Sequence, residues 1–252
     1  MSDSTDILED REESYFVSMT DLMVGMVFIF VIILMSFALS LKEAERSNRQ
    51  TVEQVANVDV ARGDMLERLR QYLAERGVSV EVVWEHGVLR LPEDVLFASG
   101  RAELSPEGLT NLAALANGLR AVLPCYAGAA WQPETCGETY GGRLEAVLIE
   151  GHTDSDPVSP AAWFRSNLGL SAFRAINTLD RIVQVEPVLS QLANDRGEPL
   201  FGVGGYGESR RRVMDERTDA DKRLNRRIDL RFLMATPRPP ELERVERELR
   251  PQ

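Results

Sequence analysis

The chain has 252 residues, of which 44% are hydrophobic, and a formal net charge of −11. This length is sufficient for one folded domain with additional segments. The acidic balance argues against a nucleic-acid-binding protein, because neutralising phosphate groups requires clustered lysine and arginine.

The N-terminal part of the chain contains a candidate membrane span. Residues 1–15 are polar and acidic, and we expect them to lack a stable structure of their own. An apolar segment follows over residues 16–41, and about 20 such residues match a bilayer core of roughly 30 Å. A signal peptide, the alternative, would have a basic start, a shorter apolar run and a small-residue cleavage site. The acidic start and the long run favour one uncleaved transmembrane helix.

Asp21 is the only charged side chain between Glu13 and Lys42. An ionisable side chain at the centre of a membrane helix costs ~2.5–3.5 kcal/mol on insertion scales, and intramembrane acids are usually functional. Two interpretations give Asp21 a purely structural role. In the first, its carboxylate extends to the membrane interface. In the second, Thr20 and Asp21 cap a helix. In the functional interpretation Asp21 carries protons, because desolvation favours a neutral carboxyl group and local water access can then switch its protonation.

Residues 42–77 are charged and lack proline, and leucines at 66, 69 and 73 recur at helical spacing. This pattern predicts a helical connector that ends at Gly77. A compact domain is predicted over residues 78–235, beginning with a hairpin that turns at His86-Gly87. Ser105 is expected to cap a helix that starts at Pro106. Its buried stripe would consist of Leu109, Leu112, Leu115, Leu119 and Val122.

The second half of the predicted domain continues with alternating elements. The sequence predicts a strand over LEAVLIEGH, a helix over residues 160–185, a shorter helix near 187–194, and strands at FGVGG and NRRIDLRFLM. The order β-β-α-β-α-(α)-β-β predicts an α+β fold in which helices cover one face of a mixed sheet. Residues 236–252 form a polar tail.

Two features give opposite indications of the compartment. Cys125 and Cys136, the only cysteines, are the first and last residues of the segment CYAGAAWQPETC. They can form a disulfide in an oxidising compartment. A reduced, incidental pair is the alternative. Only Arg11 precedes the apolar segment, whereas residues 42–49 contain three cations, and the positive-inside rule then places the C-terminal region in the cytoplasm.

Four blocks occur in order within residues 78–235: GHTDSDP, NLGLSAFRA, GYGESR and NRRIDLRF. Together they resemble the OmpA-like peptidoglycan-binding domain, which has equivalent blocks at similar spacing. Such a domain behind a single span with an early aspartate resembles the MotB class of stator subunits. Within that class, SMTDLMVGMVFIFVIILMSFAL resembles the B subunits of the Zorya anti-phage defence systems. Flagellar MotB proteins usually have a basic N-terminus, so the acidic start favours defence over motility.

The resemblance implies a binding site for diaminopimelate in peptidoglycan stem peptides. Asp154 and Arg174 match the family residues that bind its ammonium and carboxylate groups, which suits the chemistry of these side chains. Without the resemblance, this pair would be interpreted as a surface ion pair worth under ~1 kcal/mol. The supporting site residues are Asn167 and Ser171, on the same helix face as Arg174, and Asn225 and Arg226 from the NRR block.

The sequence gives little indication of catalysis. His152 in GHTD suggests a metal ligand or a base, but the chain has two histidines and no cysteine at ligand spacing, so we expect a structural role. The segment GVGGYG lacks the Lys-Ser/Thr that completes a phosphate-binding loop. We therefore predict no enzyme activity, no catalytic residue, no metal and no cofactor.

The resemblance also implies a location and partners. Peptidoglycan lies outside the inner membrane, so residues 1–15 would be cytoplasmic and residues 78–235 periplasmic, against the cation count. A single helix cannot enclose a water path, and the family implies a multi-span MotA-like partner subunit (ZorA in Zorya systems). Five copies of that partner would surround a homodimer of this chain. Residues 42–77 would also act as a plug. The expected coupling ion is a proton, with Na⁺ as the alternative. Cytoplasmic defence effectors would be indirect partners of this chain. A flagellar stator subunit and a passive membrane-to-wall tether are the alternative functions.

Overall fold

The computed structural model describes residues 3–98, 100–128, 136, 143–159 and 164–236. The chain divides into two compact units. One comprises residues 1–53 and 238–252, and the other comprises residues 54–237. Each unit is described by itself below.

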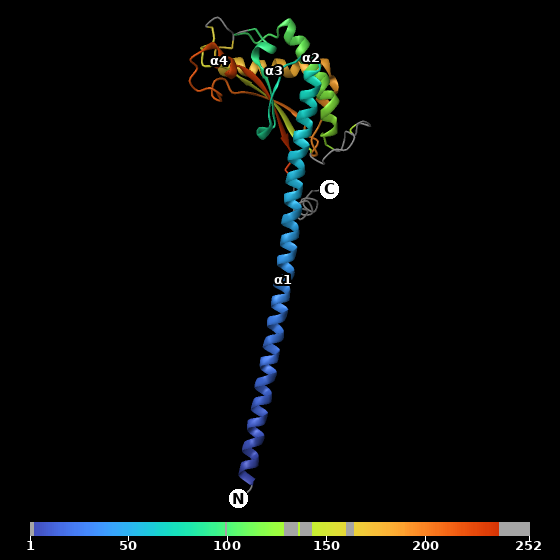
Figure 1. Cartoon of the computed structure of the whole chain (residues 1–252), viewed down its shortest axis with the longest axis vertical. Helices are drawn as coiled ribbons and strands as arrows, with labels where there is room; N and C mark the ends of the chain where they lie inside the picture. Colours follow the sequence, from blue (N-terminus) through green and yellow to red (C-terminus); the bar gives the residue numbers. More distant parts are fainter. Residues whose placement is uncertain (1–2, 99, 129–135, 137–142, 160–163, 237–252) are drawn as a thin grey trace. The chain divides into compact units, whose positions relative to one another are not determined.

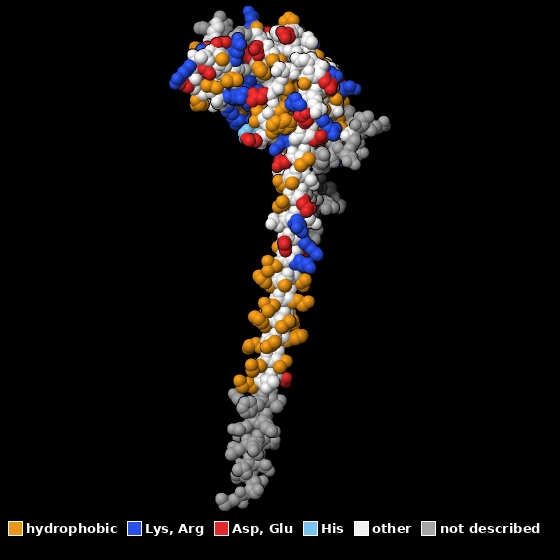
Figure 2. All heavy atoms as spheres, viewed as in Figure 1, with side chains coloured by type: hydrophobic (Ala, Val, Ile, Leu, Met, Phe, Trp, Pro, Cys, Tyr) orange, Lys and Arg blue, Asp and Glu red, His pale blue; other side chains and the backbone are white. Residues whose placement is uncertain are grey.

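Helix α1 extends from Asp3 to Ala74 (Figure 1). It contains an 18-residue window of mean hydropathy 2.9, and among the described residues it is the one helix long and apolar enough to cross a membrane. In the first unit, the large apolar side chains from Met19 to Leu41 are exposed, and they cover the visible face of this stretch in Figure 2. A helix that is apolar on all sides requires an apolar environment, either lipid or protein.

The second unit is built on a five-stranded sheet with the order β1-β2-β5-β3-β4. Strands β3 and β4 are parallel, and the other neighbouring pairs are antiparallel. The predicted α+β fold with a mixed sheet is therefore confirmed. The strands are β1 (Glu81–Val83), β2 (Val88–Pro92), β3 (Leu144–His152), β4 (Phe201–Gly205) and β5 (Arg227–Met234).

One hydrophobic core joins the sheet to the last turns of α1 and to helices α2 (Pro106–Val122) and α3 (Asn167–Val185). Leu66, Leu69 and Leu73 of α1 are fully buried in this core. The apolar stripe that predicted a connector thus belongs to the folded domain, whose compact unit begins at residue 54. Helix α1 ends at Ala74, just before Gly77, whose φ of 75° lies in the left-handed region that favours glycine.

Helix α2 begins as the sequence predicts. The Ser105 side chain accepts a hydrogen bond from the Gly108 N–H at 2.9 Å, and Pro106 is the first helical residue. The buried stripe contains Leu112, Leu115, Leu119 and Val122. Leu109 was expected in that stripe but is 38% exposed.

Helix α3 begins at Asn167 rather than near residue 160. Ser166 caps it by accepting a hydrogen bond from the Gly169 N–H at 3.1 Å. A cap fixes the first turn of a helix, and here it lies just before the NLGLSAFRA block. The part of the prediction that falls on residues 160–163 lies outside the described residues.

Two further helical segments differ from the prediction. The short helix expected near residues 187–194 is a 3₁₀ helix, η4 (Pro187–Gln191). An unpredicted helix, α4 (Asp219–Asn225), precedes β5. A capping box stabilises its start, because Thr218 accepts a hydrogen bond from the Asp221 N–H and Asp221 accepts one from the Thr218 N–H.

Cys125 and Cys136 form a disulfide, with their Cα atoms 5.3 Å apart. Most of the residues between them (129–135) lie outside the described part of the chain. Cys125 ends the 3₁₀ helix η3 (Leu123–Cys125), which follows α2 directly. The bond therefore links Cys136 to the end of η3. Disulfides persist in oxidising compartments and are rare in the cytosol.

Candidate ligand-binding site

Four charged side chains from different parts of the chain meet at one end of the sheet. Glu93 follows β2, Asp154 follows β3, Arg174 lies in α3, and Arg226 lies between α4 and β5. The strand register brings them together, because the last residues of β2 and β3 both pair with the first residue of β5, Arg227.

These side chains form a chain of alternating charge, which we call the ion-pair chain: Asp154, Arg226, Glu93 and Arg174. Arg226 Nη1 donates to Asp154 Oδ2 at 2.6 Å, and Arg226 Nε lies 2.9 Å from Glu93 Oε2 as an ion pair without hydrogen-bond geometry. Arg174 Nη2 donates to Glu93 Oε1. Arg174 Nε also donates to the backbone carbonyl of Arg101 at 2.8 Å.

The ion-pair chain is largely withdrawn from solvent. Arg174 is 2% exposed, Glu93 5% and Asp154 7%. Burial raises the pKa of Glu93 above its ordinary value, against the opposing charges of Arg174 and Arg226. Removing one partner from such a set leaves an uncompensated buried charge, which costs about 3–5 kcal/mol. The chain of ion pairs therefore holds three loops and a helix in one arrangement.

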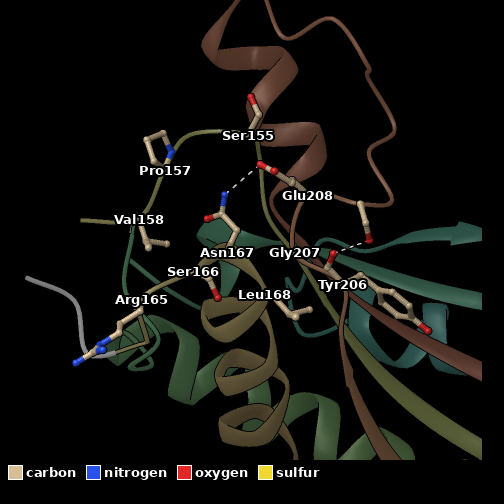
Figure 3. A pocket seen from close by; sticks show the side chains of 11 residues that line it. Ser155, Pro157, Val158, Arg165, Ser166, Asn167, Leu168, Tyr206, Gly207 and Glu208 are labelled. Carbon is tan, nitrogen blue, oxygen red and sulfur yellow. Dashed lines mark hydrogen bonds between the residues drawn. The ribbon is translucent and has the colours of Figure 1, made fainter. Parts of the chain in front are cut away.

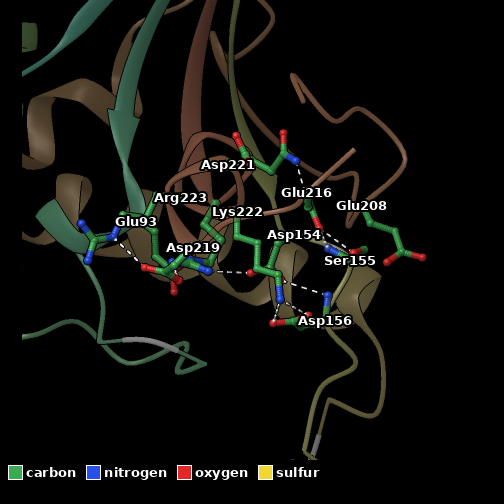
Figure 4. A network of polar contacts seen from close by, with 12 residues as sticks. Glu93, Asp154, Ser155, Asp156, Glu208, Glu216, Asp219, Asp221, Lys222 and Arg223 are labelled. Carbon is green, nitrogen blue, oxygen red and sulfur yellow. Dashed lines mark hydrogen bonds and ion pairs between the residues drawn. The ribbon is translucent and has the colours of Figure 1, made fainter. Parts of the chain in front are cut away.

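A cavity of about 210 Å³ opens beside the ion-pair chain. The residues that line it are Glu93, Asp94, Phe97, Asp219, Arg223 and Arg226. The lining contains three carboxylates and two guanidinium groups, and Arg226 Nη2 lies 3.4 Å from Asp219 Oδ1. Figure 4 shows Glu93, Asp219 and Arg223 in the network of polar contacts. A small ligand that carries both an ammonium and a carboxylate would find opposite charges for each in this cavity.

A larger cavity of about 710 Å³ lies beside the start of α3 (Figure 3). It is lined by Ser155, Pro157, Val158, Arg165, Ser166, Asn167, Leu168, Tyr206, Gly207, Glu208 and Ser209. Asn167 joins its walls, because its amide nitrogen donates to the backbone carbonyls of Asp154 (3.3 Å) and Asp156 (2.9 Å) and to Glu208 Oε2 (3.3 Å). The predicted site residue Asn167 thus faces this cavity and fixes the loop that carries Asp154.

The predicted polar face of α3 is buried against the sheet. Ser171 is fully buried, and its hydroxyl group accepts a hydrogen bond from the Gly207 N–H at 2.8 Å and donates to the Leu168 carbonyl at 2.9 Å. Gly151 makes this close approach possible, since an added Cβ would lie 2.0 Å from the Ser171 carbonyl oxygen. Ser171 and Arg174 are therefore buried rather than exposed in a surface cleft.

Asn225 is a positioning residue in this structure. It is fully buried, and its side-chain oxygen accepts from the backbone N–H groups of Arg212 (2.6 Å) and Val213 (3.0 Å). Its amide nitrogen donates to the Val213 carbonyl at 2.8 Å and to Glu216 Oε1 at 2.5 Å. Glu216 in turn accepts from the Ser155 N–H at 3.0 Å, next to Asp154. Asn225 therefore acts on the site through the loop that it holds.

Replacing Asn225 with alanine is expected to lower the free energy of unfolding by at least about 2 kcal/mol, because several buried polar groups lose their partners. Urea unfolding of the purified protein measures this. Asn117→Ala is the matched control: Asn117 donates one local bond to the Ala113 carbonyl within α2, and its loss should cost under about 1 kcal/mol. Equal costs for the two variants would contradict the positioning role.

Glu93 is the site residue that the sequence did not reveal. It lies in RLPEDVLF, outside the four blocks that carry the family resemblance, and only the pairing of β2 with β5 places it between Arg174 and Arg226. An acidic residue directly after a strand and beside apolar residues is a weak signal of burial. It does not identify the partner.

A second polar cluster lies beside the sheet, where Glu150, His152 and Asp229 approach one another closely enough to hold a metal ion. Burial and the neighbouring Arg227 lower the pKa of His152 to about 3, so its ring is neutral at physiological pH. Both carboxylates are already paired with guanidinium groups, those of Arg90, Arg227 and Arg231. These cations would repel a metal ion, and we assign none to this cluster.

The fold has counterparts among solved structures. A MotB-like protein from Desulfovibrio vulgaris is 24% identical, with 71% of this chain and 97% of that chain covered and a TM-score of 0.53. The periplasmic domain of Helicobacter pylori MotB is 16% identical (65% and 87% covered, TM-score 0.43), and the cell wall anchor of the T6SS from Pseudomonas aeruginosa is 20% identical (66% and 97%, TM-score 0.45). No protein-family model and no curated protein matches the sequence. The first likeness shows a shared fold.

Proposed function

We propose that this chain is the membrane-spanning, peptidoglycan-anchored B subunit of a stator-like ion-driven machine. The observation that carries the proposal is the combination, in one chain, of the fold of a MotB-like protein with an apolar helix that contains a single early carboxylate, Asp21. The four OmpA-like sequence blocks support the wall-binding part, and Asp21 supports the ion-driven part.

The ligand of the folded domain is the diaminopimelate of the peptidoglycan stem peptide. Its free end carries an ammonium and a carboxylate on one carbon, and the ion-pair chain offers carboxylates and guanidinium groups side by side. Asp154 binds the ammonium, and Arg226 and Arg174 bind the carboxylate. Asn167, Ser171 and Asn225 hold the surrounding loops. The fit rests on alternating charge rather than on a single strong contact.

The proposed location is the bacterial inner membrane, with the N-terminus in the cytoplasm and the folded domain in the periplasm. The apolar segment of α1 is long enough to span a bilayer once. The Cys125–Cys136 disulfide supports an oxidising compartment for the folded domain. This evidence and the wall ligand outweigh the cations that follow the span.

Asp21 is the proposed proton carrier. A proton that crosses about 100 mV releases about 2.3 kcal/mol, which can drive a conformational cycle. A single helix cannot give Asp21 access to water on both sides, so a multi-span MotA-like partner is required, and we propose five copies around a homodimer of this chain. The wall-binding domain holds the machine in place while the partner moves.

The acidic N-terminal segment and the sequence around Asp21 favour anti-phage defence of the Zorya type, with ZorA as the partner, over a flagellar stator. Neighbouring genes distinguish the two, because helicase or nuclease genes indicate defence and flagellar genes indicate motility. A passive tether would need no carboxylate in the span. Copurification of a neighbouring multi-span protein with this chain would count against the tether.

Sedimentation with purified peptidoglycan tests the wall-binding proposal. The full chain in detergent is expected to pellet with peptidoglycan that contains diaminopimelate. Peptidoglycan with lysine at the same position is the control. Lysine lacks the second carboxylate of diaminopimelate, so the chain should bind this peptidoglycan much more weakly. Failure to pellet with either form, or equal pelleting with both, would contradict the proposed ligand.

A further inference from the structure

A carboxylate of the chain itself, that of Glu93, lies between the two arginines of the site. We propose that Glu93 is an internal competitor, whose carboxylate takes the place between Arg174 and Arg226 that the carboxylate of a bound amino-acid ligand occupies. The inference rests on the proposed function and extends it to a residue outside the family blocks. Glu93 then sets the affinity of the site.

The contacts of Glu93 are those expected of a bound carboxylate. Its two oxygens face two different guanidinium groups, Oε1 towards Arg174 and Oε2 towards Arg226 at 2.9 Å. Asp154 Oδ2 binds the far side of Arg226 at 2.6 Å. With two acids and two arginines, the set has no net charge, so none of its cations is left free for a ligand.

Access to the two arginines differs. Of the described residues in the ion-pair chain, Glu93 and Arg226 line the 210 Å³ cavity, whereas Arg174 and Asp154 do not. A ligand in this cavity therefore meets Glu93 before Arg174. Its carboxylate can pair with Arg174 only by replacing that of Glu93.

The exchange is feasible in charge and geometry. A ligand with one ammonium and one carboxylate adds no net charge, so the released Glu93 can pair with the ammonium beside Asp154. Glu93 lies in a single 3₁₀ turn, η2 (Glu93–Val95), and its backbone N–H donates to the Arg226 carbonyl at 3.1 Å. Rotation about its side-chain bonds moves the carboxylate while this backbone contact stays in place.

The test is calorimetric titration of the full chain in detergent with free meso-diaminopimelate. Glu93→Gln should bind about tenfold more tightly than the unchanged chain, equivalent to about 1.4 kcal/mol, because a neutral amide competes less well for the guanidinium groups. Glu103→Gln, the same substitution at an exposed position in the following segment, should leave the affinity unchanged. Glu93→Asp has a shorter side chain, which withdraws the carboxylate from the two arginines without changing the charge, and it should also bind the ligand more tightly. If Glu93→Gln does not fold, Glu93→Asp tests whether residue 93 competes with the ligand.

The outcomes separate the inference from the proposed function. Tighter binding by a folded Glu93 variant supports both. If the unchanged chain binds but the Glu93 variants bind equally or more weakly, the proposed ligand stands and the internal competitor is overturned. If neither the unchanged chain nor any folded variant binds, both are overturned.

Discussion

Asp21→Asn is expected to reduce ion conduction, and the phage protection that depends on it, to background. Asparagine has nearly the same shape but cannot bind and release a proton, so the variant should still insert into the membrane and pellet with peptidoglycan. Proton flux into vesicles that contain the chain and its multi-span partner, together with phage plating on cells, measures the effect. The loss should be complete because no other charged residue lies between Glu13 and Lys42.

The control for this result keeps the carboxyl group. Asp21→Glu retains a titratable group displaced by one methylene, and should keep part of the flux. A passive tether predicts that both variants behave like the unchanged chain. Full flux and full protection in Asp21→Asn would therefore refute the proton carrier while leaving wall anchoring intact.

Asp154→Ala is expected to abolish binding to peptidoglycan, because it removes the carboxylate proposed to hold the ligand's ammonium. The domain should remain folded, since Arg226 keeps its contacts with Glu93 and Asp219. We expect a cost of about 3–5 kcal/mol in unfolding free energy, because the variant removes one partner from the buried ion-pair chain. Sedimentation measures binding, and thermal unfolding verifies the fold.

Asp156→Ala provides the matched control for Asp154→Ala. Asp156 lies two residues away in the same loop, but its side chain is 57% exposed and pairs with Lys222 Nζ at 2.6 Å. An exposed pair contributes little to stability, so this variant should bind the wall and unfold like the unchanged chain. Equal loss of wall binding in both variants would show that the loop as a whole, and not Asp154, carries the effect.

The order of the elements could be predicted because it depends on local pattern. Ser105 and Pro106 define the start of α2, and the Gly87 turn separates β1 from β2, through residue preferences that operate over a few positions. The Asp154 loop was located in the same way, since it directly follows a short apolar strand. The packing partner of the helical stripe at residues 66–73 could not be predicted, because such a stripe is the same whether it packs against its own domain or a partner.

The arrangement within the site could not be predicted in this way. Helical spacing placed Ser171 and Arg174 on one face of α3, but the sheet glycines decide that this face is the buried one, since Gly151 and Gly205 leave room for the helix backbone. The position of Glu93 depends on strand pairing with residues more than 130 positions away in sequence. The first property depends on packing between helix and sheet, and the second on strand pairing between distant parts of the sequence.

The burial of the ion-pair chain should make its ion pairs tolerant of salt. Exposed ion pairs weaken as ionic strength rises, whereas pairs removed from water are screened much less. Arg174 and Glu93 are almost wholly enclosed, and the side chain of Arg226 is 16% exposed. Binding of the proposed ligand at this enclosed site should then change little between dilute and concentrated salt solutions.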